Sequence, residues 1–191
     1  MSAPTVTDNG VILLDGARYE HATAWLYQTF PSHQPWPLLL GTPYEPIADA
    51  GPILLAAPVG STVYDAWMHG NGIKDSVWLE SDASVEELHR ILQRRLRIFT
   101  PEHRELWLRL ADARPLYLAW QSKAQWPEGF WHRITRIWLQ YEGTTFCAWR
   151  NEHPEKDDAP ASLGIAAQLT LGWPLLEALA KQDDTAQEVV L

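Results

Sequence analysis

The 191-residue chain contains one cysteine, Cys147, so it cannot form an internal disulfide, and it fits a reducing compartment. No uninterrupted apolar segment approaches the roughly 20 residues that a membrane-spanning helix requires. The first ten residues contain neither the basic region nor the apolar core of a signal peptide. The sequence therefore predicts a cytoplasmic protein that does not bind a membrane.

Basic residues are also scarce. Lys and Arg total 15 against 24 Asp and Glu, which gives a formal net charge of −9 at pH 7. A surface that binds nucleic acid needs clustered cations, and the arginines between residues 90 and 97 are better explained as the C-terminal end of a helix. We therefore expect no nucleic-acid partner.

No motif in the sequence assigns catalysis or a cofactor. The glycines do not have the spacing of a phosphate-binding loop, and no Gly-x-Ser-x-Gly nucleophile motif is present. The seven histidines do not pair at a metal-ligand spacing, and Cys147 lies in a strand pattern that favours a buried, unreactive thiol. We expect no catalytic residue, no metal and no cofactor.

Two similar corners stand out in residues 13–18 (LLDGAR) and 108–115 (LRLADARP). In each, an apolar strand-like segment ends at an aspartate, and an arginine follows within three residues. Asp15 and Asp112 are expected to be helix N-caps, because their carboxylates accept hydrogen bonds from unpaired backbone amides. Arg18 and Arg114 then lie at the positive end of a helix dipole. We predict that internal carboxylates or carbonyls compensate both cations.

The same corners leave an enzymatic interpretation open. Asp15 and Asp112 could converge as an acid–base pair and act with a histidine in a small hydrolase. This alternative predicts a deep pocket where the groups meet, and loss of turnover when either aspartate is replaced by asparagine. A third interpretation is a structural subunit that self-associates through a symmetric, tryptophan-rich interface.

Hydrophobic periodicity predicts an α+β fold with a mixed, largely antiparallel sheet flanked by helices, plus a C-terminal hairpin and a helical appendage. Strands and hairpins are expected at residues 11–14, 53–57, 74–80, 96–110 and 133–150. Helices are expected at residues 15–30, 61–69, 84–92, 112–123 and 163–179, the last interrupted at residues 172–174. Ser84 and Glu87 form a capping-box pattern, and the alternation of Leu106, Leu108 and Leu110 predicts one buried strand face. Residues 151–161 are polar and acidic, so we expect a mobile linker there.

Tryptophan is unusually abundant, with eleven residues. Trp is seldom fully buried and its indole N–H needs an acceptor, so we do not expect all eleven in the core of one small domain. Most single tryptophans are half-buried core residues, but Trp is also a favoured anchor in protein interfaces. For the set as a whole, we predict a partner-binding surface.

Five short blocks occur in an order and spacing that resemble a known family. They are LDGAR at 14–18, LGTPYE at 40–45, IADAGPIL at 47–54, SDAS with ELHR at 81–90, and LRLADARPL at 108–116. Together they resemble the domain of unknown function numbered 4123, a family of bacterial type VI secretion effector chaperones, also called adaptors. The resemblance covers about residues 11–120.

The resemblance implies a cytoplasmic chaperone that binds a cognate toxin effector and helps load it onto the VgrG spike protein, without catalysing a reaction. It implies a chaperone lobe at residues 1–123 and a variable C-terminal lobe at residues 124–191. The family-motif residues with a structural or partner-facing role would be Asp15, Arg18, Asp112 and Arg114. We expect the variable lobe to contribute to effector selection through four aromatic anchors, Trp126, Trp131, Trp138 and Trp149.

Overall fold

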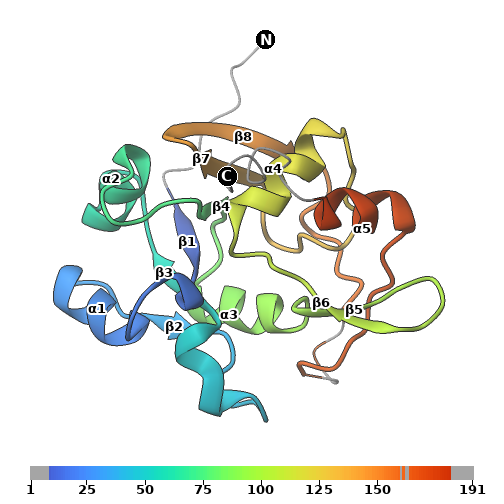
Figure 1. Ribbon diagram of the computed structural model, residues 1–191, viewed down its shortest axis with the longest axis horizontal. Coiled ribbons are helices and arrows are strands. Elements are labelled where there is room, and N and C mark those ends of the chain that lie inside the picture. The colour runs from blue at the N-terminus through green and yellow to red at the C-terminus, as the bar shows by residue number, and fades with distance from the viewer. Residues whose placement is uncertain (1–8, 160, 162–163, 182–191) are drawn as a thin grey trace, which may run out of the picture.

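A six-stranded antiparallel sheet crosses the molecule, as seen in a computed structural model that describes residues 9–159, 161 and 164–181 (Figure 1). Its strands are β1 (Gly10–Asp15), β2 (Trp36–Pro37), β3 (Pro52–Ala56), β4 (Val77–Glu80), β7 (Arg136–Tyr141) and β8 (Thr144–Arg150). Their order is β2-β3-β1-β4-β7-β8, and each neighbouring pair is antiparallel. The predicted α+β fold with a largely antiparallel sheet is confirmed.

Helices cover both faces of this sheet. Helices α1 (Ala22–Thr29) and α2 (Thr62–His69) pack on one face, whereas α3 (Val85–Gln93), α4 (Ala113–Gln121) and α5 (Trp173–Ala180) pack on the other (Figure 1). Strand β1 shows why two layers are needed, because its successive side chains point to opposite faces. Ile12 and Leu14 join the first core, and Val11 and Leu13 join the second. Residues 11–14 are therefore buried on both faces.

The starts of α2 and α3 follow the capping chemistry of the sequence. The Ser61 hydroxyl accepts the Tyr64 amide at 3.3 Å before α2, and the Ser84 hydroxyl accepts the Glu87 amide at 3.1 Å before α3. In a capping box the Glu87 carboxylate would accept the backbone amide of Ser84. Here it forms an ion pair instead, since it lies 3.3 Å from Arg133. The serine therefore predicts where the helix begins, whereas the glutamate pairs with a residue distant in sequence.

The helix predicted for residues 15–30 is wrong in its first turns. Asp15 caps only a short 3-10 turn, Gly16–Arg18, and α1 begins at Ala22 after His21 adopts a left-handed backbone with φ of 50°. Gly16 explains this corner, because a Cβ there would lie 2.2 Å from the backbone oxygen of Asp49. The close approach of the 3-10 segment Glu45–Ala50 therefore requires a glycine at this corner.

The hairpin predicted at 96–110 forms a second, two-stranded sheet of β5 (Arg97–Phe99) and β6 (Glu105–Trp107). The expected buried face is wrong at Leu106, which is 39% exposed, although Leu110 is buried. Strand β6 ends at Trp107, so the alternation that we predicted does not continue to Leu110. The segment before α5 reaches this sheet, because Thr170 forms an isolated parallel bridge with Phe99 of β5.

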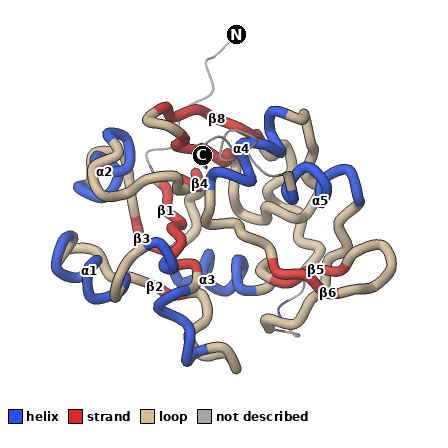
Figure 2. Tube along the Cα trace, viewed as in Figure 1, coloured by secondary structure: helices blue, strands red, loops and turns tan. Residues whose placement is uncertain are grey.

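The prediction of a mobile linker is wrong for the described part of residues 151–161. This segment contains no helix or strand up to residue 159, as the loop that follows β8 in Figure 2 shows, but its contacts anchor it. Asn151 donates to the carbonyls of Trp131 and Ile134, and Ala159 is fully buried. Backbone hydrogen bonds also tie the loop to its neighbours, from Asn151 to Thr135, from Arg133 to Pro154 and from Asp158 to Gly129.

The two predicted lobes share one sheet. Strand β7 from residues 124–191 pairs with β4 from residues 1–123, and α5 packs against α4. The boundary at residue 123 stays a prediction. The long C-terminal helix expected at 163–179 is shorter, since the described part of that range becomes helical only at Trp173. Within the described residues, no helix is both long and apolar enough to cross a membrane.

Candidate functional site

The structure brings the two Asp–Arg corners side by side. Arg109, which precedes the second corner, lies 2.8 Å from the Asp112 carboxylate and 3.5 Å from that of Asp15. The Asp112 side chain is only 1% exposed, whereas the Arg109 side chain is 63% exposed. Arg109 therefore joins the end of β1 to the start of α4 while presenting its charge to solvent.

Arg114 holds Asp112 from the other side. Its guanidinium donates two hydrogen bonds to the carboxylate, at 2.9 and 2.8 Å, and its backbone amide donates a third at 3.0 Å. Burial on its own raises the pKa of Asp112, but the hydrogen bonds from Arg114 and the charges of Arg114 and Arg109 outweigh it and lower the pKa. The same Asp112 hydrogen bonds raise the pKa of Arg114. The predicted compensation of Arg114 is confirmed.

Asp75 links the first corner to the second. Its carboxylate lies 2.9 Å from Arg18, and its backbone carbonyl accepts the Ala113 amide at 2.9 Å. Arg18 also donates to the Lys74 carbonyl at 3.3 Å, so its predicted internal compensation is confirmed. Asp15, Arg18, Asp75, Arg109, Asp112 and Arg114 thus form one group of three carboxylates and three guanidiniums, the ion cluster.

Sequence reasoning singled out four of these six residues and missed Asp75 and Arg109. Arg109 stands within the second corner, and its position at the end of an apolar segment was the available signal. Asp75 adopts a left-handed backbone with φ of 48°, and its amide is bound by the Gln140 side chain at 2.9 Å. That geometry depends on β7, so no local pattern indicates it.

A small pocket lies at the meeting point of the corners. Its lining runs through Asp15, residues 50–52 and residues 108–112, and among the described residues no histidine contributes to it. The histidine-assisted hydrolase would need one within reach of the two aspartates. The carboxylates face arginines here, which is the arrangement of an ion-paired corner.

A larger apolar groove begins beside this pocket. It has a volume of about 270 Å³ and shares Leu108, Arg109 and Leu110 with the corner pocket. One wall is the end of β6 with the chain that follows it, and the other is α5. The residues of this apolar groove are Leu106, Trp107, Leu108, Arg109, Leu110, Pro115, Leu116, Trp173, Leu176, Glu177, Leu179 and Ala180.

Several large side chains of the groove stay in solvent. Trp107 is 48% exposed and Trp173 is 42% exposed. Trp107 is held by Tyr44, whose ring is 4.8 Å away edge-on, and by Arg97, which lies over the indole. The Trp173 indole N–H donates to Glu102 at 2.9 Å. Exposed apolar side chains that gather in one groove are typical of an interaction site.

The four tryptophans predicted as partner anchors lie elsewhere. Trp131 and Trp149 are buried in the core, and half-buried Trp126 packs against both at centroid distances of 5.0 and 5.9 Å. Trp138 is half-buried on the other face of the sheet, against Trp78. Trp126, Trp131 and Trp149 line a second pocket of about 270 Å³. The partner-binding role of the four predicted anchors stays a prediction, while Trp107 and Trp173 are more exposed than these four.

The remaining candidate groups are unremarkable in their surroundings. Cys147 lies half-buried in β8, and burial raises the pKa of its thiol, which disfavours the reactive thiolate. No group of three or more potential metal ligands occurs among the described residues.

The chain belongs to the domain of unknown function family DUF4123, whose model matches residues 12–128, more than half of the sequence. The match contains the ion cluster and one wall of the apolar groove, and α5 lies outside it. The family resemblance of the sequence is confirmed.

A curated relative is the accessory protein VasW of Vibrio cholerae serotype O1. It is 27% identical over 128 residues, which cover 67% of this chain and 42% of the relative. The chain therefore spans less than half the length of this relative. No solved structure matches the chain.

Proposed function

We propose that this protein is a cytoplasmic type VI secretion adaptor that binds a cognate toxin effector and helps load it onto the VgrG spike protein, by binding and without catalysis. Membership of the DUF4123 family and similarity to an accessory protein support this role. The observation that carries it is the apolar groove, because an adaptor needs a surface on which another protein can bury apolar side chains.

Two parts of the chain build this surface. The wall formed by residues 106–116 belongs to the family match, whereas α5 comes from residues 124–191. The C-terminal part of the chain therefore contributes directly to the groove, which supports the proposal that it takes part in effector selection. The half-buried Trp126 and Trp138 remain further candidates for the same role.

Co-purification from the native bacterium tests this function. The tagged full chain is isolated, its partners are identified by mass spectrometry, and its mass is measured by light scattering after gel filtration. The adaptor predicts a stoichiometric heterologous protein that also associates with VgrG. Self-association alone would instead favour a structural subunit, and isolation of the chain without any partner would contradict the adaptor.

A further inference from the structure

The groove differs from the isolated exposed apolar positions of the protein because its members are contiguous. Tyr27, Ile47 and Val59 are exposed but lie on separate elements, and single exposed apolar residues are ordinary on protein surfaces. In the groove, Leu106, Trp107 and Trp173 surround one apolar hollow. A cavity of 150 Å³ holds one benzene ring, so about 270 Å³ accommodates roughly two large apolar side chains.

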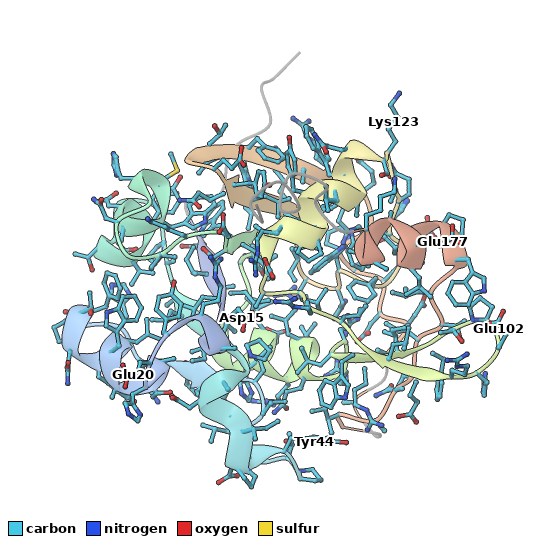
Figure 3. All side chains as sticks on the ribbon, in the orientation of Figure 1. Asp15, Glu20, Tyr44, Glu102, Lys123 and Glu177 are labelled. Atoms are coloured by element: carbon cyan, nitrogen blue, oxygen red, sulfur yellow. The ribbon has the colours of Figure 1, made fainter. Side chains whose placement is uncertain are left out.

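The charges along the groove indicate the chemistry of what fills it. Arg109 lies at the end next to the ion cluster, and Glu177 projects from α5. Figure 3 shows Glu177 well apart from Asp15, beside which Arg109 lies. A bound segment therefore meets a cation at one end of the groove and a carboxylate on its other wall.

Arg109 is available to a partner because the ion cluster does not depend on it alone. Arg114 forms two side-chain hydrogen bonds with Asp112, so the buried carboxylate keeps a bidentate partner if Arg109 turns outward. Arg18 and Asp75 form their own pair at 2.9 Å. Arg109 is the more exposed of the two arginines on Asp112, at 63% against 47% for Arg114, so it is the one that can turn toward a partner.

We propose that the apolar groove binds a segment of the client protein that carries two large aliphatic or aromatic side chains next to a carboxylate, with the carboxylate on Arg109. This inference rests on the proposed adaptor function and identifies its client-binding site. The apolar side chains fill the hollow between residues 106–116 and α5. Glu177 disfavours a second carboxylate on the α5 side, so the client segment docks in one direction.

Site-specific photo-crosslinking in the native bacterium tests the site and its chemistry together. Benzoylphenylalanine replaces Leu106 or Ala180 in the groove, and Ile47 or Tyr27 as exposed controls, in separate variants of the full chain. Crosslinked peptides are then sequenced by mass spectrometry. We expect both groove positions to capture the same heterologous segment, with large apolar residues beside an Asp or Glu, and the controls to capture it at least tenfold less.

Three results overturn the inference. They are crosslinks from the groove to a second copy of this chain, crosslinks to its own residues 182–191, and a captured client segment without the apolar–acidic pattern. If a client co-purifies but crosslinks only at control positions, the groove is not its binding site, while the adaptor function is still supported. Absence of any client in both experiments contradicts the adaptor function itself.

Substitutions with matched controls measure the same contacts on the client identified by crosslinking. Leu106→Glu and Ala180→Glu are expected to weaken its affinity at least tenfold, while Ile47→Glu leaves it unchanged. Arg109→Gln is expected to weaken it about threefold, and Arg90→Gln, which alters an equally exposed arginine paired with Glu86, is expected to have no effect. Equal losses in groove and control variants would overturn the site.

Discussion

Two regions of this molecule contain tryptophan in different surroundings. The tryptophan core, formed by Trp126, Phe130, Trp131 and Trp149, has centroid distances of 4.5–5.9 Å between packed rings. The groove instead places Trp107 and Trp173 on its rim, each about half in solvent. The number of tryptophans in the sequence does not predict which rings are buried and which are exposed. The helices and strands that pack over the rings determine which of them remain exposed to a partner.

The largest expected effect is in the tryptophan core. Trp131→Ala removes a 4%-exposed ring that contacts Trp126 and Phe130, so the free energy of unfolding should fall by about 3–5 kcal/mol. Urea denaturation followed by circular dichroism measures the loss. A decrease below about 1 kcal/mol would mean that Trp131 does not support the core, and would renew its candidacy as a surface anchor.

The buried arginine beside this core gives a second large effect. Arg95 is fully buried and donates to the carbonyls of Phe130, Gly129 and Ile91 and, at 2.8 Å, to the Asp157 carboxylate. Arg95→Met should cost about 3–5 kcal/mol, because it leaves these buried carbonyls without this donor and Asp157 with Arg94 as its remaining arginine partner. Arg90→Met, at an exposed i,i+4 pair, is the control and should cost about 0.5 kcal/mol or less. Similar losses in both variants would contradict the anchoring role.

The ion cluster should show a smaller, pH-dependent effect. Asp112→Asn is expected to cost about 1–3 kcal/mol at pH 7, since it weakens hydrogen bonds to a charged group. The folded-state pKa of Asp112 is depressed, so its charge stabilises the protein above the unfolded value of about 3.9 and stops doing so as pH falls through the folded pKa. The unfolding curves of the parent and the variant should therefore converge below about pH 4. A pH-independent difference would contradict the paired charge.

The smallest effect on stability belongs to the groove rim. Trp173→Ala should change the free energy of unfolding by no more than about 0.5 kcal/mol, since the ring is 42% exposed and its indole N–H donates to the exposed Glu102. The same substitution should weaken client binding several-fold, as truncation of an aromatic anchor does. Thermal unfolding and a binding titration separate the two effects. A large stability loss without a binding loss would assign Trp173 to the core.

Local chemistry predicted much of this fold. Ser61, Ser84 and Asp112 begin their helices as their capping hydrogen bonds require, and β7 and β8 form a hairpin within the predicted range 133–150. The split before α1 could not be predicted, because Asp49, distant in sequence, approaches Gly16 and accepts the Thr23 amide in the first turn of α1 at 2.8 Å. Contacts distant in sequence therefore set the departures from local pattern.

The candidate site was predictable only in part. Both corner aspartates and their arginines stand out in the sequence, but their convergence on Arg109 and Asp75 requires the sheet. Alternation at Leu106 and Leu108 indicated a strand face without showing that part of it stays uncovered. The groove exists because α5 lies opposite residues 106–110, a contact distant in sequence that no local pattern indicates.

The most direct measurement of the central claim is the affinity of the co-purified client for two matched variants of the full chain. Ala180→Glu places a charge in the apolar groove, and Ile47→Glu places one at an exposed apolar site elsewhere. The groove account predicts that the first variant loses the client at least tenfold while both variants remain folded and the second binds as the parent does. Client binding that is the same in both variants would contradict it.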